Sequence, residues 1–336
     1  MANATKALDR ALTLELVRVS ERAAIGAARL RGRGDERAAD QAAVEAMHGE
    51  LNRLNVAGRI VIGEGESDEV ARLFVGEEVG TGEGPRVDIA VDPLEGTTIC
   101  AKALAGALAV LAVAEPGSLL TVPEIYMEKI AIGPGYPNGL VDLDCPPGEN
   151  LAAIAREKGV GIADLTVCIL DRPRHAALIG AVREAGAAIR LIGDGDIAGV
   201  IQTTSADETG VDVYMGIGGA PEGVLAAAAL GCIGGQIQCR LHPMDAADRM
   251  SLRDVGIDDP GRKYAGPEMA SGDVIFSATG VTSGSLLAGV RFRGDGVIVS
   301  ESVVMRSATA SVRWIRAEHR PGDGGRQDDA SGRESA

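Results

Sequence analysis

Apolar residues follow two patterns along this chain, steps of three and four residues and short continuous runs, and these patterns predict the helices and the strands. Between residues 6 and 30, apolar residues recur at steps of three and four, which predicts an amphipathic helix. A second helix follows the break at residues 32–35, with alanines on its apolar side and Asp40 in its first turn. Shorter apolar runs predict strands at 60–62, 87–91 and 108–113, and an extended segment at 126–131.

Helices and strands alternate in the second half of the chain. Helices are predicted at 150–158, 173–184, 196–202 and 221–230, and strands at 165–170, 188–192, 211–215 and 234–241. This alternation is typical of a layered α/β fold. Polar residues 242–272 predict irregular structure, and apolar runs at 274–278, 297–304 and 310–315 predict three closing strands. The pattern does not show which sheet these last strands join.

Glycine and proline are concentrated at residues 133–148, which marks a candidate domain boundary. We therefore expect an N-terminal α/β half at 1–143 and a C-terminal α/β half at 144–316. The remaining segment, 317–336, is polar and glycine-rich, and it is predicted to be a disordered tail.

The densest candidate chemistry lies where the apolar run at 87–91 ends. Asp92 and Glu95 follow this run, with Pro93 between them, and Gly96 and Thr97 come next. We expect the strand to stop at Pro93 and a helix to begin near Gly96. Carboxylates above a helix N-terminus can hold an oxygen-ligated cation beside a phosphate. The structural alternative is a helix cap or a turn, because Asp is common in β-to-α connections.

A second predicted strand end, after residue 62, supplies four more acids: Glu64, Glu66, Asp68 and Glu69. Carboxylates crowded together repel one another unless a cation or a proton intervenes. Asp40 adds a further acid, and its alternative role is a solvated first-turn residue favoured by the helix dipole. All these donors are oxygen atoms, which indicates Mg²⁺ or Mn²⁺ rather than Zn²⁺.

Two glycine-rich segments and two arginines are candidates for binding an anion or a sugar. GDGD at 193–196 could approach a ligand closely, or it could be an ordinary turn. GIGGAPEG at 216–223 is predicted to be a turn before a helix, and its free amides suit an anion, although a single glycine-rich turn is weak evidence. Arg172 and Arg174 flank Pro173 at a predicted helix start, where they oppose the helix dipole, so a phosphate is the favoured partner.

The composition restricts the possible partners. The 336 residues, 46% hydrophobic and 24% charged, suit one large or two medium globular domains. The net charge of −15 argues against nucleic acid, and it means that the protein needs a cation to handle phosphate. Neither a membrane span nor a signal peptide is predicted, so a cytoplasmic protein is expected. The five cysteines include no CxxC pair and predict reduced thiols.

Three motifs, in this order, give the chain a family resemblance: IVIGEGE at 60–66, DIAVDPLEGT at 88–97 and GIGGAPEG at 216–223. The chain resembles the class II fructose-1,6-bisphosphatases of bacteria from about residue 10 to about residue 316. DRPRH at 171–175 is similar to the branch that includes bifunctional fructose-1,6-/sedoheptulose-1,7-bisphosphatases. The resemblance implies an α/β fold, a layered αβαβα sandwich of the lithium-sensitive sugar-phosphatase type. It also implies a homo-oligomer, either a tetramer or a dimer.

The resemblance also implies a role for individual residues. It makes the N-terminal half metal-binding and the C-terminal half sugar-phosphate-binding. Asp40 and Glu64 would hold one metal ion, and Asp92, Glu95 and Glu222 would hold the other. Substrate would be held by Glu95, Gly96, Thr97, Tyr126, Arg172, Arg174, Asp194, Asp196 and Gly219, and the catalytic residues would be Asp68 and Thr97. Two ions of Mn²⁺ or Mg²⁺ would occupy each site.

The implied activity is hydrolysis of the C1 phosphate of fructose 1,6-bisphosphate to fructose 6-phosphate and phosphate, in gluconeogenesis or the Calvin cycle. The alternatives are a bifunctional or sedoheptulose-1,7-bisphosphatase and, from a different class, an inactive metabolite-binding regulatory protein. One departure motivates the last alternative: Glu36 stands where family members commonly carry a catalytically supportive Lys, with Arg37 next. Either Arg37 takes over this cationic role or activity is reduced.

Overall fold

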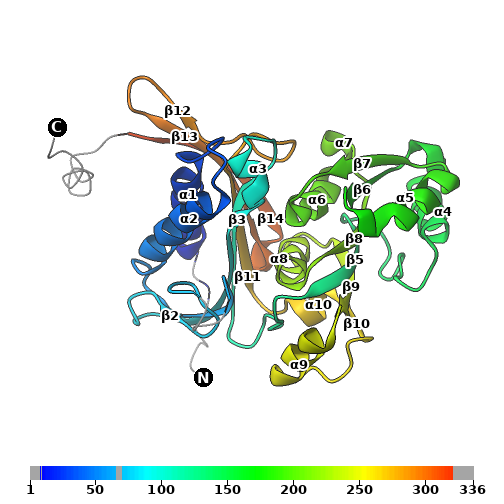
Figure 1. Cartoon of the computed structure of the whole chain (residues 1–336), viewed down its shortest axis with the longest axis horizontal. Helices are drawn as coiled ribbons and strands as arrows, with labels where there is room; N and C mark the ends of the chain where they lie inside the picture. Colours follow the sequence, from blue (N-terminus) through cyan, green and yellow to red (C-terminus); the bar gives the residue numbers. More distant parts are fainter. Residues whose placement is uncertain (1–7, 9, 66–69, 321–336) are drawn as a thin grey trace, which may run out of the picture.

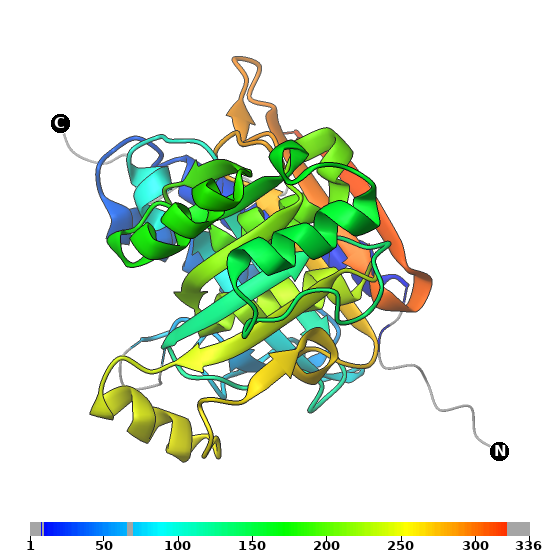
Figure 2. The same cartoon turned by 90° about the vertical axis from the view of Figure 1, so that its right-hand side faces the viewer.

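Two β-sheets and the helices around them make up the computed structural model of this chain, which describes residue 8 and residues 10–65 and 70–320. Figure 1 shows the sheets side by side with a helix layer between them and one outside each, and Figure 2 looks onto the second sheet. The predicted layered αβαβα arrangement is therefore confirmed.

The first sheet has eight strands in the described residues, four from the N-terminal part of the chain and four from the C-terminal part. Its order is β12 (Arg291–Phe292), β13 (Ile298–Arg306), β11 (Val274–Gly280), β4 (Leu108–Ala114), β3 (Arg86–Glu95), β1 (Ala57–Ile62) and β2 (Glu78–Val79), with β14 (Ser311–His319) also paired to β13. Only β1 and β3 run parallel among these described pairs. The last strands therefore join the sheet that the first strands begin.

The second sheet has six described strands from the middle of the chain. Its order is β10 (Lys263–Ala265), β9 (Gln236–His242), β5 (Tyr126–Ile132), β8 (Val213–Gly219), β6 (Thr166–Leu170) and β7 (Ala188–Ile192). The pairs β6·β7 and β6·β8 are parallel, whereas β5 pairs antiparallel with both of its neighbours. This sheet therefore joins one α/β portion to one antiparallel portion.

Helices fill three layers. The outer layer over the first sheet is α1 (Leu12–Ala28) and α2 (Glu36–Leu51); the outer layer over the second sheet is α4 (Pro147–Lys158) and α5 (Ala176–Ala185). Between the sheets lie α6 (Asp196–Gln202), α8 (Ala220–Gly231) and α10 (Gly266–Met269). Three further short helices are α3 (Thr97–Ala101), α7 (Ala206–Thr209) and α9 (Ala246–Asp254).

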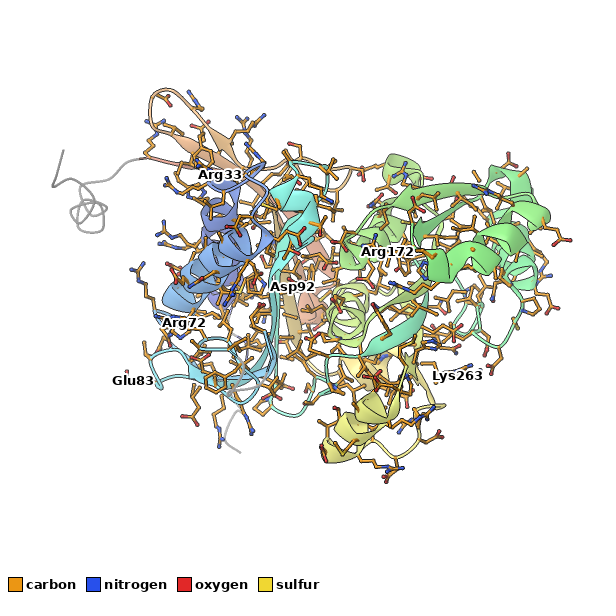
Figure 3. All side chains as sticks on the ribbon, in the orientation of Figure 1. Arg33, Arg72, Glu83, Asp92, Arg172 and Lys263 are labelled. Carbon is orange, nitrogen blue, oxygen red and sulfur yellow. The ribbon has the colours of Figure 1, made fainter. Side chains whose placement is uncertain are left out.

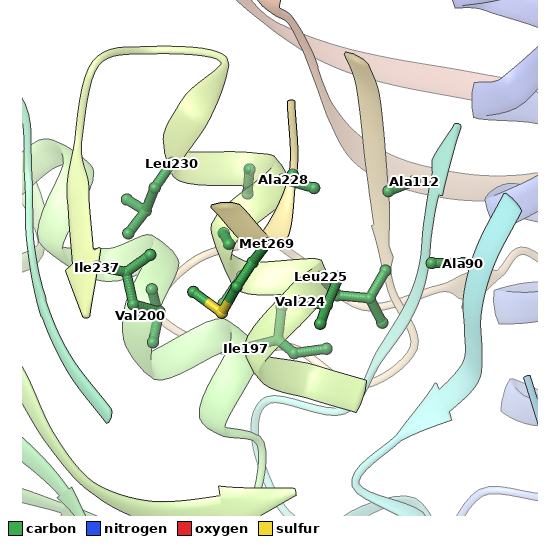
Figure 4. Close-up of a cluster of buried hydrophobic side chains, with 14 of the residues drawn as sticks. Ala90, Ala112, Ile197, Val200, Val224, Leu225, Ala228, Leu230, Ile237 and Met269 are labelled. Carbon is green, nitrogen blue, oxygen red and sulfur yellow. The ribbon is translucent and has the colours of Figure 1, made fainter. Parts of the chain in front are cut away.

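The core between the sheets is built mainly from small and aliphatic side chains. Figure 4 shows Leu225 of α8 directed toward Ala90 and Ala112 of the first sheet. On the other side, Leu230 and Ile237 belong to the same buried cluster. Helix α8 contacts strands of both sheets, and its alanines permit this close approach. A chain with 2% aromatic residues thereby fills a two-sided core.

Four sequence predictions differ from the structure. The strand at 87–91 does not stop at Pro93, because β3 continues to Glu95 through an irregularity. Residues 216–219 are not a turn but the end of β8, paired with β5. The predicted irregular region 242–272 contains α9, β10 and α10. The predicted tail begins too early, because β14 extends to His319.

Sheet membership does not follow the proposed boundary at residue 143. Strand β5, which precedes this boundary, lies in the second sheet, while β11 to β14, which follow it, lie in the first sheet. The division into 1–143 and 144–316 therefore stays a prediction, and the sheets themselves divide the chain into one inserted middle segment and two flanking segments. Among the described residues, no helix is both long and apolar enough to cross a membrane.

Phe276 tests the core between the sheets. Its side chain on β11 is fully buried, and removing the ring leaves a cavity that the two sheets cannot close. Phe276→Ala should lower the free energy of unfolding by about 3–5 kcal/mol. The measurement is urea unfolding of the purified protein, with Phe292→Ala as the matched control because that ring is 43% exposed. An equal loss in both variants would contradict this account of the core.

Candidate active site

A bulge in β3 brings Asp92 and Glu95 to the same side of the first sheet. In a regular strand, residues three apart point to opposite faces. Here Asp92 lies opposite Val110 and Glu95 lies opposite Leu108, so β3 carries one residue more than β4 between these pairs. Val110 and Leu108 both face the layer between the sheets. The bulge therefore turns both carboxylates toward that layer.

Glu222 completes a cluster of three carboxylates. It lies in the first turn of α8, and one oxygen atom from each of Asp92, Glu95 and Glu222 lies within 4.8 Å of the other two. These are the three acids that the resemblance assigned to one metal ion. Two of them come from the first sheet and one comes from the helix between the sheets, so the cluster depends on the packing of those layers.

The cluster opens into a cavity of about 360 Å³. Asp40 of α2 and Glu64, which follows β1, also line this cavity, as do Gly96 and Thr97 at the start of α3. Gly96 has a left-handed backbone (φ +85°), which glycine adopts without strain. Asp40 and Glu64 thus share the cavity without belonging to the close three-residue cluster.

Glu124 is an acid in this cavity that the sequence did not single out. It precedes β5, and its charge contributes to raising the pKa of Glu64, Asp92 and Glu222. A lone acid in a short proline-containing connection has no periodic pattern around it. Its place in the acidic cavity depends on how the second sheet packs against the first.

Burial and mutual repulsion raise the pKa values of these carboxyl groups. Burial is the main cause in each case: it raises the pKa of Glu64 to about 9, that of Asp92 to about 7 and that of Glu222 to about 8. The pKa of Glu95 also lies well above its ordinary value, because of burial and then the charges of Asp92, Asp196 and Glu222. The folded protein thus holds several carboxylates that need a proton or a cation.

A divalent cation fits this donor set. The donors are all carboxylate oxygens, which suit Mg²⁺ or Mn²⁺. Oε2 of Glu222 is buried and has no hydrogen-bond partner in the described part of the chain. An unpartnered buried carboxylate oxygen, beside two further acids, is the arrangement that a bound cation would satisfy.

The glycines before α8 leave space for acids rather than for an anion. A Cβ atom on Gly219 would lie 1.8 Å from Oε2 of Glu222, and one on Gly218 would lie 2.0 Å from Oδ2 of Asp196. Both contacts are impossibly short, so larger residues would displace these carboxylates. The glycine-rich segment is therefore a strand end that accommodates carboxylates, which explains its composition better than a phosphate-binding turn does.

A second cavity of about 520 Å³ adjoins the first and shares several acids with it. Glu95, Glu124, Asp194 and Glu222 line both cavities. The predicted sugar-binding residues all line the second one: Tyr126, Arg172, Arg174, Asp194, Asp196 and Gly219. Figure 3 shows Asp92 at the first sheet and Arg172 on the side of the second sheet. The two adjoining cavities thus contain both the carboxylate cluster and the two arginines.

The two arginines are held in different ways. Arg172 lies 3.5 Å from a carboxylate oxygen of Asp194. The Nε and a terminal nitrogen of Arg174 donate to the carbonyl oxygen of Ile217 at 3.0 and 2.8 Å, and its guanidinium lies 4.7 Å from the centre of the Tyr126 ring. Arg174 is exposed, so it can meet a ligand in the second cavity.

Other predicted residues either have contacts within the protein or lie outside the described residues. Asp196 is almost fully buried in an ion pair with Lys129, which limits its availability to a sugar hydroxyl. Asp68, the predicted water-activating acid, lies outside the described residues. Asp35 caps α2 by accepting from the amide of Ala38 at 2.9 Å, and the charge of Glu36, next in the chain, contributes to raising the pKa of Asp194. Glu36 thus adds negative charge near the site.

An αβαβα sandwich whose central cavities join a carboxylate cluster to paired arginines has the layout of a metal-dependent sugar-phosphate hydrolase. The chain belongs to the family described as bacterial fructose-1,6-bisphosphatase, glpX-encoded, which matches residues 10–319. Members of this family are phosphoric monoester hydrolases and depend on a metal, and the acid cluster here can bind one.

Two cyanobacterial relatives illustrate the match. A protein of Synechococcus sp. (strain JA-3-3Ab), named D-fructose 1,6-bisphosphatase class 2/sedoheptulose 1,7-bisphosphatase, is 45% identical over 93% of this chain and 96% of its own length. A protein of the same name from Synechococcus sp. (strain RCC307) is 42% identical over 94% of this chain and 98% of its own length. The predicted family resemblance is therefore confirmed.

The raised pKa values predict how pH acts on the metal-free protein. A carboxyl whose pKa rises on folding stabilises the folded state at low pH, and that contribution is lost as the pH rises through its folded pKa. The melting temperature of metal-free protein should therefore fall as the pH rises from about 4, the ordinary carboxyl range, to about 7 to 9, the folded pKa values of Asp92, Glu222 and Glu64. Mn²⁺ should restore more stability at the upper end, because it binds ionised carboxylates.

Glu222→Gln isolates one of these groups. The amide cannot ionise, so the variant should show a shallower fall in melting temperature between about pH 5 and pH 8 and a smaller stabilisation by Mn²⁺. Differential scanning fluorimetry after chelation measures both. Glu184→Gln, on the exposed face of α5, should behave as the wild type. A melting temperature that rises with pH in metal-free wild type would contradict the assignment.

Proposed function

We propose that this chain hydrolyses the C1 phosphate of fructose 1,6-bisphosphate to give fructose 6-phosphate and phosphate. The observation that carries the proposal is the junction of a cavity that contains only acids as charged groups with a second cavity that also contains two arginines. One holds the acids that can bind a cation, and the other is lined by Arg172 and Arg174. A sugar with a phosphate at each end matches this layout, because one phosphate needs a cation and the other needs fixed positive charge.

The acidic cavity would hold two ions of Mn²⁺ or Mg²⁺. Asp92, Glu95 and Glu222 would hold one, and Asp40 and Glu64 would hold the other. Such ions supply positive charge that neutralises the phosphate and stabilises the charge that develops in the transition state.

The chain's own groups would position the reacting atoms. Gly96 and Thr97, which line the acidic cavity at the start of α3, would contact the departing phosphate through an amide and a hydroxyl. We assign the deprotonation of the attacking water to Asp68, with help from Thr97, on the family resemblance. A positioned base contributes about 10²–10⁴-fold to such a reaction.

The far phosphate supplies binding energy that positions the near one. Arg174 lies over the Tyr126 ring and is fixed by the Ile217 carbonyl, so little side-chain freedom remains to be lost when a phosphate binds. Arg172, held loosely by Asp194, can exchange that partner for a phosphate. Binding energy at this end is thereby used to orient the C1 phosphate at the other end.

Sedoheptulose 1,7-bisphosphate is the second candidate substrate. The relatives that are 42–45% identical are named for both sugar bisphosphates. The second cavity has a volume of about 520 Å³ and is also lined by Met244 and Asp245, beyond the predicted sugar-site residues. We therefore propose activity on both substrates.

Further proposals follow from the family. They are a homo-oligomer (a tetramer or a dimer), a cytoplasmic location, a role in gluconeogenesis or the Calvin cycle, and kinship with the lithium-sensitive sugar phosphatases. With Glu36 in the chain, either Arg37 takes over the cationic role or activity is reduced. An inactive protein that only binds the metabolite is not favoured, because it would not need the metal ligands that line the first cavity.

Asp92→Asn tests the reaction and the site together. Wild-type protein should release phosphate from both sugar bisphosphates with Mn²⁺ present, as measured by a coupled phosphate assay. The variant should lose about 100-fold or more in kcat, because several kcal/mol of charge stabilisation depends on the ion that Asp92 helps to hold. Asp258→Asn, at an exposed position, should keep normal activity. Folded wild type that releases no phosphate from either sugar would refute the function, and an active Asp92→Asn would refute only the site.

Arg174→Ala tests the far-phosphate end. Losing hydrogen bonds to a charged group should raise KM for both bisphosphates by about tenfold or more. Arg183→Ala, which removes an exposed arginine from the last turn of α5, is the matched control and should leave KM unchanged. Steady-state kinetics that show the same KM in wild type and Arg174→Ala would remove this residue from the substrate site.

A further inference from the structure

Lys129 is a charged side chain buried in the middle of the second sheet. It lies on β5, opposite Gly216 of β8 and Cys239 of β9, and only 1% of it is exposed. Burying an ammonium group without a partner is costly, so its surroundings must provide compensation. The proposed reaction does not use this residue, which has no direct access to the cavities described above.

The partner of Lys129 is Asp196, the first residue of α6. The Nζ atom donates to Oδ2 of Asp196, which is itself 5% exposed. The next amide, that of Ile197, donates to Oε1 of Glu95 at 3.0 Å. Lys129 is therefore linked to Glu95 of the carboxylate cluster through two hydrogen bonds, its own to Asp196 and that of the adjacent Ile197 to Glu95.

Two glycines leave the space that this ion pair occupies. A Cβ atom on Gly218 would lie 3.1 Å from Nζ of Lys129 and still closer to Asp196, and one on Gly223 would lie 3.1 Å from Cε of Lys129. Both glycines belong to the GIGGAPEG motif at 216–223. The motif thus leaves room for the lysine side chain, and it also carries Glu222 of the carboxylate cluster.

Lys129 also offsets negative charge beside the cluster. The charge of Asp196 contributes to raising the pKa of both Glu95 and Glu222, while the charge of Lys129 lowers that of Glu222. Burial tends to lower the pKa of Lys129, but Asp196 and then Glu222 raise it, and the net shift is upward. The lysine therefore remains a fixed cation behind the acids.

We propose that Lys129 is a positioning residue of this active site: its ammonium group fixes Asp196 and, through the start of α6, orients the carboxylate of Glu95 for binding a divalent cation. This inference rests on the proposed function only in its kinetic consequence. Its consequence for cation binding can be measured whatever the substrate is.

Lys129→Met keeps the length of the side chain and removes its charge. Loss of a residue that orients a metal ligand should weaken Mn²⁺ binding and lower kcat by about 10-fold to 100-fold each. The KM for fructose 1,6-bisphosphate should change far less, because Arg172 and Arg174 are untouched. Isothermal titration with Mn²⁺ alone gives the affinity, and circular dichroism shows whether the variant is folded.

The double variant Lys129→Met/Asp196→Asn supplies the rescue. It leaves no buried charge unpaired, so it should fold and recover part of the Mn²⁺ affinity and kcat lost in Lys129→Met, while remaining below the wild type. Lys263→Met is the matched control: Lys263 is on β10 of the same sheet and pairs with Asp142 at 2.7 Å, but it is 30% exposed and remote from the cavities. This control should retain wild-type affinity and kcat.

Several outcomes would overturn the proposal. Wild-type Mn²⁺ affinity and kcat in folded Lys129→Met would show that the charge is dispensable, and wild-type values in the double variant would show the same of the pair. A loss of melting temperature with unchanged Mn²⁺ affinity would indicate a purely structural ion pair. If Lys129→Met does not fold, the Mn²⁺ affinity and kcat of the double variant are compared with those of the wild type. Values below the wild type support the proposal, and wild-type values overturn it. If wild type releases no phosphate from the sugars, the proposed function fails, and the Mn²⁺ titrations still test Lys129.

Discussion

Mutual repulsion among buried carboxylates is the constraint on which the centre of this molecule depends. Asp92, Glu95 and Glu222 approach within 4.8 Å of one another, and Asp40, Glu64 and Glu124 line the same cavity. Each ionised group raises the free energy of its neighbours, and partial burial amplifies the effect. The surrounding fold must therefore hold these groups together against their charge until a cation or protons neutralise them.

The backbone meets this constraint with two devices. The bulge in β3 turns Asp92 and Glu95 to one side of the first sheet, which a regular strand would prevent. The glycines at the end of β8 leave room for the carboxylates of Asp196 and Glu222. Because one device lies in each sheet, the cluster forms only when α8 packs between them. The alanine-rich core that lets the sheets approach is thus also a condition for the site.

Local patterns predicted the alternating helices and strands of the middle of the chain and the acids at two strand ends, whereas the family resemblance implied the αβαβα sandwich and the roles of the site residues. Apolar runs that end in acids, such as the one before Asp92, mark buried strand ends without any knowledge of the rest of the chain. The bulge was missed because a proline normally ends a strand, whereas Pro93 here lies inside the irregularity. Helix α9 was missed because it is short and polar, although Asp245 caps it through the amide of Asp248 at 3.0 Å.

Residues whose role depends on distant partners could not be predicted in this way. Lys129 follows Glu128 in a strand that is otherwise mostly apolar, and its role appears only with Asp196, which lies 67 positions further along the chain. Glu124 likewise has no local pattern. Membership of the last strands in the first sheet required the three-dimensional pairing of β11 with β4. Sequence patterns predict which face of a helix or strand is buried and where the element ends. They do not predict which faces of distant elements pack against each other.

The same charges also determine how a polyanionic substrate approaches. With a net charge of −15 and an acidic central cavity, the protein repels a sugar bisphosphate until cations occupy the carboxylate cluster. In the proposed substrate complex, Arg172 and Arg174 would attract the far phosphate, and Asp194 partly offsets the charge of Arg172. Cation binding and binding of the near phosphate are therefore thermodynamically coupled: each lowers the electrostatic cost of the other. Lys129 stands outside this exchange, because it is paired permanently and cannot be displaced by substrate. It keeps one fixed positive charge behind the acids, so that the cluster remains ordered in the interval when no cation is bound.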